Sequence, residues 1–113
     1  MRRGDIVIIE LPAADGREQM GVRPALIVHC DATLSQVPVV LVVPLTSQMN
    51  ALRFPHTISV QPLSMNGLTA HSVLLIFQLR AVDSRRIRGT AGRLEPEVLD
   101  QVNAELHAVL GLA

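Results

Sequence analysis

The apolar residues of this chain come in short runs, and each run is closed by proline, glycine or a polar cluster. Runs of this length, rich in Val, Ile and Leu, are typical of β-strands and too short for most helices. We expect strands over residues 6–11, 25–29, 37–45, 56–60, 72–78 and 88–94. Residues 80–87 are ambiguous and could form a helical turn. The chain has 2 Phe and neither Trp nor Tyr, so the core must be aliphatic.

The last segment has a different period. Pro96 suits the first position of a helix, and Gly111 suits its end. Apolar residues in between recur at steps of three and four, which places them on one helical stripe: Val98, Leu99, Val102, Leu106, Val109 and Leu110. The sequence therefore predicts a mainly β fold with α (α+β): a small, strongly bent antiparallel sheet or barrel with a C-terminal amphipathic helix. A chain of 113 residues fits a single domain, residues 1–113.

A polar loop at residues 12–21 leads into Arg23 and Pro24. Proline fixes its own φ and biases the residue before it toward an extended backbone. A guanidinium held in this way can bind a phosphate through two parallel hydrogen bonds. The alternative is a structural arginine that pairs with Glu18 across the loop.

Two adjacent hydroxyls, Thr46 and Ser47, follow the apolar run 37–45. A hydroxyl at a strand end commonly satisfies a local backbone group, and it can also donate to a phosphate oxygen. Because side chains alternate along a strand, Ser47 is expected to point away from Thr46.

Charge and cysteine content narrow the class of protein. The net charge is zero, so no overall field attracts nucleic acid, but residues 80–93 carry a cluster of arginines that predicts a local basic strip. The single Cys30 excludes an internal disulfide and favours a reducing compartment, with a buried thiol as the expected role. We find no export signal or run long enough to span a membrane, and expect a cytoplasmic location. No metal-ligand spacing or Ser-His-Asp set is visible, so no metal or cofactor is expected.

Several short motifs in this order resemble the MazF/PemK toxins of bacterial toxin–antitoxin modules: Arg3-Gly4-Asp5-Ile6-Val7, the Gly-x-Glu-Gln-x-Gly-x-Arg-Pro loop, Pro44-Leu45-Thr46-Ser47, and Ser72-Val73 leading to Gln78-Leu79-Arg80. The resemblance covers residues 3–112. It implies an SH3-like barrel, a homodimer, and a MazE-like antitoxin partner. It also implies a sequence-specific, metal-independent endoribonuclease for single-stranded RNA, including mRNA, with Arg23 and Thr46 as the catalytic residues. The ribose 2′-OH would attack the adjacent phosphate, leaving 2′,3′-cyclic phosphate and 5′-OH ends.

Other residues are candidates for RNA binding. In the loop, Glu18 and Gln19 could orient the guanidinium or contact a nucleotide. Ser47 and Arg80 are further candidates, Phe54 could stack on a base, and Gln78 matches a family glutamine that could read a base edge. Phe77 stands where the family often has an acidic residue, and a place in the core or an interface is favoured for it.

The general base is not evident from the sequence. A guanidinium with a pKa above about 12 is a poor base at neutral pH, and His56 is the histidine nearest to Thr46 that could take this role. Two other functions are open: a non-enzymatic, CcdB-like gyrase poison on a related fold, and a peptide-binding SH3-like barrel. Two phenylalanines make the aromatic groove of the latter difficult to build.

Overall fold

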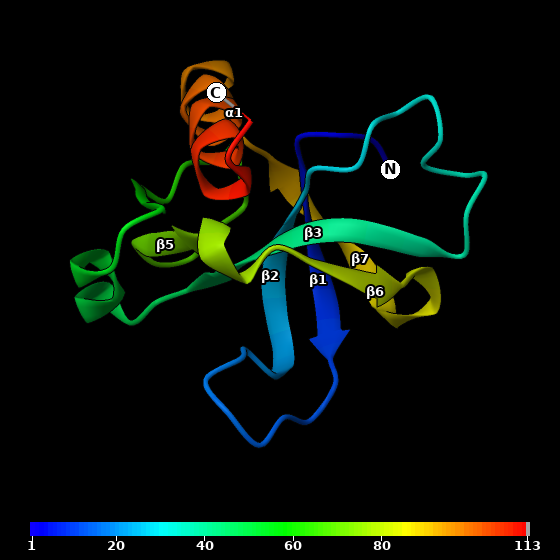
Figure 1. Cartoon of the computed structure of the whole chain (residues 1–113), viewed down its shortest axis with the longest axis horizontal. Helices are drawn as coiled ribbons and strands as arrows, with labels where there is room; N and C mark the ends of the chain where they lie inside the picture. Colours follow the sequence, from blue (N-terminus) through cyan, green and yellow to red (C-terminus); the bar gives the residue numbers. More distant parts are fainter. Residues whose placement is uncertain (113) are drawn as a thin grey trace.

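A computed structural model describes residues 1–112; Ala113, the last residue of the predicted domain, lies outside the described residues. Seven strands form one antiparallel sheet that bends strongly, and a single long helix covers one side of it (Figure 1). The elements are β1 (Asp5–Leu11), β2 (Gly21–Ile27), β3 (Val39–Thr46), β4 (Thr57–Val60), β5 (Ser72–Leu75), β6 (Arg80–Asp83), β7 (Ile87–Arg93) and α1 (Pro96–Leu110). This confirms the predicted fold class.

Strand β3 connects the two parts of the sheet because it changes partners along its length. Residues 39–42 pair with β6, residues 42–44 pair with β2, and Leu45 and Thr46 pair with β5. The strand order is β4-β5-β3-β2-β1-β7, with β6 attached to β3 beside this path. Thr46, the candidate catalytic hydroxyl, is thus the last residue of the central strand.

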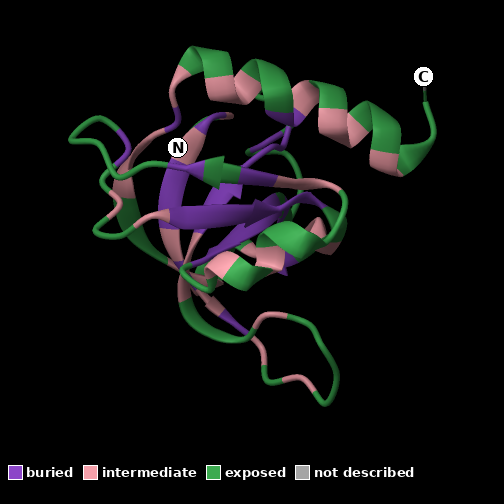
Figure 2. Ribbon diagram, turned by 90° about the vertical axis from the view of Figure 1, so that its left-hand side faces the viewer, coloured by how far each residue is buried: buried purple, intermediate pink, exposed green. Residues whose placement is uncertain are grey.

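Both faces of the bent sheet are covered, which explains the continuous apolar runs. One cluster lies between the sheet and α1 and includes Ile6, Leu26, Leu45 and Val102. The other lies on the opposite face and includes Ile9, Ile27 and Val42. Figure 2 shows the buried strands between an exposed outer face of α1 and the exposed loop that joins β1 to β2.

Several element boundaries differ from the prediction. Strand β2 begins at Gly21, so Arg23 lies inside a strand and not before one. Pro44 lies within β3, where the strand passes from β2 to β5, although proline was expected to end the strand. Its missing N–H is tolerated there because the hydrogen-bonding partner changes.

The segments around β5 and β6 contain short 3₁₀ turns. The predicted strand 72–78 stops at Leu75 and continues as a 3₁₀ turn, Ile76–Gln78. Residues 80–87 form β6 and then a second turn, Ser84–Arg86, in which the Asp83 side chain accepts a hydrogen bond from Arg85 N. A third turn, Met49–Arg53, follows β3. Among residues 1–112, no helix has the length and apolar content needed to cross a membrane.

Candidate active site

Arg23 projects from β2 with its guanidinium held at one edge only. Its Nε donates to the carbonyl oxygen of Met20 at 3.0 Å. Within residues 1–112, no carboxylate lies within the 4.0 Å of an ion pair with this guanidinium. The alternative pairing with Glu18 is therefore absent: Glu18 Oε2 instead folds back over Gly16, 2.6 Å from where a Cβ there would lie. The remaining guanidinium donors of Arg23 are available for a ligand.

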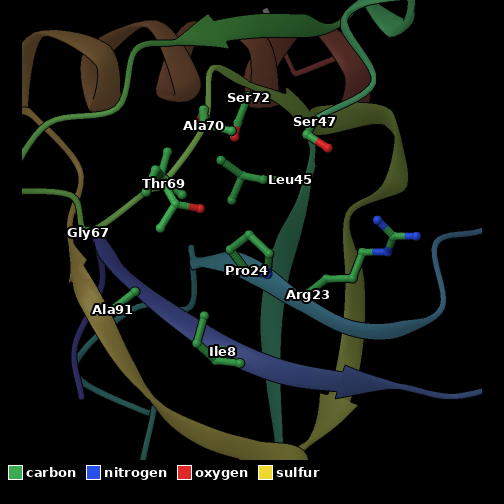
Figure 3. A pocket seen from close by; sticks show the side chains of 11 residues that line it. Ile8, Arg23, Pro24, Leu45, Ser47, Gly67, Thr69, Ala70, Ser72 and Ala91 are labelled. Atoms are coloured by element: carbon green, nitrogen blue, oxygen red, sulfur yellow. The ribbon is translucent and has the colours of Figure 1, made fainter.

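A cavity of about 270 Å³ lies beside this arginine, and we call it the arginine cavity. It is lined by Ile8, Arg23, Pro24, Leu45, Ser47, Gly67, Leu68, Thr69, Ala70, Ser72 and Ala91. Figure 3 shows Arg23 and Ser47 at the same end of the cavity, with Gly67 and Thr69 at the other end. An unpaired guanidinium beside hydroxyl groups is a suitable environment for a phosphate.

The wall of this cavity opposite Arg23 is formed by the turn around Asn66 and Gly67. Asn66 is fully buried, and its Oδ1 accepts hydrogen bonds from the backbone of Leu63 and Leu68. Its Nδ2 donates to Gln61 O and to Glu95 Oε1. All its polar capacity is used, so this side chain fixes the wall and does not bind a ligand. An Asn-Gly pair predicts the turn, but not its place beside Arg23.

A second cavity of about 360 Å³ lies on the other side of the end of β3, and we call it the phenylalanine cavity. It is lined by Arg17, Gln19, Thr46, Gln48, Ala51, Phe54, Leu75, Phe77 and Gln78. Thr46 thus faces this cavity and Ser47 faces the arginine cavity, as the alternation of side chains predicts. The pair Arg23 and Thr46 is consequently divided between two cavities that lie on either side of the end of β3.

Thr46 is 4% exposed, and its Oγ1 accepts a hydrogen bond from Gln48 N at 3.2 Å. The hydroxyl therefore satisfies a local backbone group, which is the alternative stated for it from the sequence. Its own hydrogen is still free to be donated into the phenylalanine cavity. Ser47 is exposed and can donate to a ligand next to Arg23.

The loop before β2 is held by side chains from the segment that joins β5 to β6 and from the start of β6. Gln78 Oε1 accepts from Gln19 N at 2.8 Å, and Gln78 Nε2 donates to Arg17 O at 3.1 Å. Arg80 donates to Gln19 O at 3.2 Å. Gln78 thus positions the loop with one lone pair of Oε1 and one hydrogen of Nε2, and its role in reading a base edge stays a prediction. Part of the Arg80 guanidinium is still available.

The two phenylalanines contact each other at the mouth of the phenylalanine cavity. Their ring centroids are 5.6 Å apart in an edge-to-face arrangement, and each residue is 40% exposed. Phe77 does not lie in the core, because the 3₁₀ turn after β5 directs this ring outward, and the alternative place in an interface stays a prediction. The Arg53 guanidinium carbon lies 4.8 Å from the centre of the Phe54 ring.

Two further expectations are corrected. His56 lines neither cavity: its Nδ1 lies 2.9 Å from Glu105 Oε2 on α1, so the structure gives no support to His56 as the general base. Cys30 is exposed and not buried, because β2 ends at Ile27, before it. No group of three or more His, Cys, Asp or Glu side chains in residues 1–112 is arranged to hold a metal ion.

The predicted basic strip is largely neutralised by ion pairs. Arg88 pairs with Glu10 at 2.6 Å, and its hydrogen bond and charge lower the pKa of that carboxyl. Arg85 pairs with Asp83 at 2.8 Å and lowers the Asp83 pKa to about 2, again mainly by hydrogen bonding. Arg93 pairs with Asp5 at 2.8 Å. The arginines near the cavities that have no carboxylate partner within residues 1–112 are Arg17, Arg23, Arg53 and Arg80, and one terminal nitrogen of Arg80 is engaged with Gln19 O.

Comparison with known proteins places this arrangement among toxins. The family described as "PemK-like, MazF-like toxin of type II toxin-antitoxin system" matches residues 2–110. An "Endoribonuclease MazF" from Staphylococcus saprophyticus is 31% identical over 112 residues, which are 99% of this chain and 92% of that protein.

Solved structures agree with this match. MazF from Deinococcus radiodurans superposes with a TM-score of 0.81 at 26% identity, covering 98% of this chain and 96% of that chain. A MazE–MazF complex from the same organism gives 0.76 at 27% identity, covering 100% and 97%. A mycobacterial endoribonuclease solved with its cognate antitoxin gives 0.79, covering 100% and 97%, and at 21% identity it shows the shared fold alone.

Proposed function

The chain belongs to the PemK-like, MazF-like toxins of type II toxin–antitoxin systems, and from this premise we propose that it is an endoribonuclease that cleaves single-stranded RNA, including mRNA, at specific sequences and without a metal ion. The observation that carries the proposal is the Arg23 guanidinium, which is fixed through Nε and free at its remaining donors. It shares the arginine cavity with the Ser47 hydroxyl, and the Thr46 hydroxyl faces the phenylalanine cavity on the other side of the end of β3.

In the proposed reaction the ribose 2′-OH attacks the adjacent phosphorus atom. The bond from phosphorus to the 5′-oxygen breaks, and the products are a 2′,3′-cyclic phosphate and a 5′-OH. Arg23 stabilises the extra negative charge on the phosphate oxygens in the transition state, where a fixed cation is worth most. Thr46 donates its hydroxyl hydrogen to a phosphate oxygen or orients the 2′-OH. The substrate supplies its own nucleophile, so no nucleophilic side chain is needed.

The proposal is tested by incubating the purified protein with RNA in excess chelator and sequencing the ends. We expect cyclic phosphate ends at a defined sequence, and no cleavage where the scissile nucleotide is 2′-deoxy. Arg23→Ala should lower kcat by about 100- to 1000-fold, which is typical for loss of one preorganised donor. Arg23→Lys should lose nearly as much, because an ammonium cannot replace the planar guanidinium.

Arg2→Ala is the matched control, since Arg2 is exposed and lines neither cavity at the end of β3. This variant should cleave like the wild type. Full activity of Arg23→Ala would refute the site, and absence of any RNA cleavage would refute the enzyme. The CcdB-like alternative is not favoured by the family match; inhibition of gyrase by a protein that leaves RNA intact would revive it.

We also infer that this chain acts as a homodimer in the cytoplasm and is inhibited by a MazE-like antitoxin. The antitoxin is supported by related MazF chains that have been solved as MazE–MazF complexes, whereas the homodimer and the location rest on the family resemblance. Co-expression of the neighbouring gene should restore growth and co-purify a second, smaller chain. Growth arrest that persists with every adjacent reading frame present would contradict this inference.

A further inference from the structure

The phenylalanine cavity has the composition of a site for a flat, mostly apolar ring. Phe54, Phe77 and Leu75 form its walls, and its volume of about 360 Å³ is at the lower end for ligand pockets. Both phenylalanines are 40% exposed, so their ring surfaces are accessible to a partner. Stacking on such surfaces holds unpaired bases in many proteins that bind single strands.

One residue that lines this cavity, Gln19, carries a buried polar atom without a partner among the described residues. Gln19 Oε1 is buried and is the side-chain atom in residues 1–112 that lacks any hydrogen bond while shielded from solvent. A buried acceptor without a donor is costly, so such an atom in a native protein calls for an explanation. The backbone of Gln19 is fixed at its N–H by Gln78 and at its carbonyl by Arg80. The side chain is therefore held in the cavity wall by contacts that do not involve it.

We propose, on the basis of the proposed function, that the phenylalanine cavity is a nucleobase subsite in which Gln19 Oε1 accepts a hydrogen bond from the exocyclic amino group of the base. An amino group supplies the donor that this atom lacks. Uracil is disfavoured because its one ring N–H lies between two carbonyl oxygens, which repel a carbonyl acceptor. The subsite thus favours a base with an exocyclic amino group, which adenine, cytosine and guanine carry and uracil lacks.

The position of this base along the RNA follows from the end of β3. Thr46 faces the phenylalanine cavity, and the next residue, Ser47, faces the arginine cavity with Arg23. A phosphate bound between the two cavities, at the end of β3, has one of its own nucleotides in the phenylalanine cavity. The amino-bearing base is therefore expected at one of the two positions that flank the cut.

The test uses RNA oligonucleotides with one cleavage site, varied at each flanking position. Adenosine is compared with purine riboside, cytidine with the riboside of pyrimidin-2-one, and guanosine with inosine; each analogue lacks only the amino group. For the wild type, removing the amino group at one flanking position should lower kcat/KM by about 10- to 100-fold, as expected when a buried acceptor is left unpaired. Binding is measured in parallel on oligonucleotides with a 2′-deoxy scissile nucleotide, which cannot be cleaved.

Gln19→Met is the informative variant because it removes the acceptor and keeps the length and the backbone contacts. It should cleave the amino-bearing RNA and its analogue within about threefold of each other. Gln101→Met, an exposed glutamine on α1, is the matched control and should keep the wild-type ratio. The wild-type comparison needs no variant, so it decides the matter even if Gln19→Met does not fold.

The outcomes separate this inference from the proposed function. RNA cleavage with equal rates for amino-bearing bases and their analogues at both flanking positions overturns the subsite and leaves the endoribonuclease intact. A preference for uracil that is lost on N3-methylation would overturn it as well. If no RNA is cleaved, the proposed function fails; amino-dependent binding of the uncleavable oligonucleotide that is lost in Gln19→Met would still support the subsite.

Discussion

Thr46 and Ser47 are adjacent in sequence, yet they face different cavities and have different hydrogen-bonding states. The buried Thr46 hydroxyl already accepts from Gln48 N, whereas Ser47 is exposed beside Arg23. The family resemblance assigns the catalytic hydroxyl to Thr46, and the cavity of Arg23 contains Ser47. Substitutions at the two positions separate these roles.

We expect Thr46→Val to lower kcat by about 10- to 100-fold, because the shape is kept and the donated hydrogen bond is lost. Ser47→Ala should change kcat by less than about threefold. Single-turnover cleavage of one oligonucleotide by both variants measures this directly. The reverse order would assign the catalytic hydroxyl to Ser47, and KM should be compared to detect a loss of binding alone.

Gly67 is a residue for which the backbone leaves no alternative. Its φ is +70°, and a Cβ at this position would lie 2.0 Å from the carbonyl oxygen of Ala91. Gly67→Ala should lower the free energy of unfolding by about 3 kcal/mol or more, from backbone strain and overpacking together. The corresponding fall in Tm exceeds about 10 °C for a domain of this size.

Thermal unfolding followed by circular dichroism checks this prediction. Gly89→Ala is the control, because a Cβ there meets nothing within 4 Å and its φ is not in the left-handed region. This second variant should leave Tm within about 2 °C. A Gly67→Ala protein as stable as the wild type would mean that the turn beside β7 can move away from Ala91.

At the scale of elements, the loop before β2 is attached to the sheet by a few side-chain hydrogen bonds. Gln78 makes two of them and Arg80 makes one, all to backbone atoms of Arg17 and Gln19. The segment has no regular secondary structure between β1 and β2 and projects from the body of the molecule (Figure 1). Its order therefore depends on these contacts.

Gln78→Ala should release the loop and make trypsin cleavage after Arg17 about thirtyfold faster, since two hydrogen bonds of about 1 kcal/mol each are lost. Limited proteolysis followed by mass spectrometry gives the rate at this bond. Gln101→Ala on α1 is the control and should be cleaved at the wild-type rate. An unchanged rate for Gln78→Ala would show that other contacts order the loop.

The sequence predicted the elements well where apolar patterning determines them. Helix α1 has the predicted bounds because its stripe, Pro96 and Gly111 all agree. Strand β2 begins earlier than predicted because Val22 is exposed: its backbone pairs with β1 while its side chain carries no burial signal. Residues 80–87 were ambiguous because a four-residue strand followed by a 3₁₀ turn matches neither period.

The site was predictable residue by residue, but its arrangement was not. Local chemistry picks out Arg23 and the two hydroxyls, and it cannot show that they divide between two cavities. That division depends on β3 changing partners at Pro44. The contacts of Gln78 with the loop and of His56 with Glu105 join residues far apart in sequence, which no local pattern reports.

At the scale of the whole molecule, zero net charge hides a local excess of unpaired arginines. Three of the arginines in residues 80–93 are neutralised by carboxylates, and Arg80 donates from a terminal nitrogen to Gln19 O. Near the cavities, Arg17, Arg23 and Arg53 have neither a carboxylate partner nor a hydrogen bond at a terminal guanidinium nitrogen within residues 1–112. RNA binding should therefore depend on salt as if about three phosphates were contacted. For single strands the slope of log K against log salt is about −0.7 per contact, or about −2 in total.

Arg53→Gln should make this slope shallower by about 0.7, because one phosphate contact is lost. Arg85→Gln should leave it unchanged, since that guanidinium is paired with Asp83. Fluorescence anisotropy with an uncleavable oligonucleotide, repeated at several salt concentrations, measures both slopes. An equal effect of the two substitutions would show that the arginines of residues 80–93 also bind RNA.

The division of Thr46 and Ser47 between two hollows has a consequence for the form of RNA that can be cut. An RNA strand that fills both cavities must turn sharply at the phosphate between them, and the bases on either side of this phosphate must separate. Nucleotides inside a hairpin stem are stacked and cannot separate in this way without melting the stem. Folding of a transcript is thus a form of protection, and the same short sequence should be destroyed in an open stretch and spared in a stem.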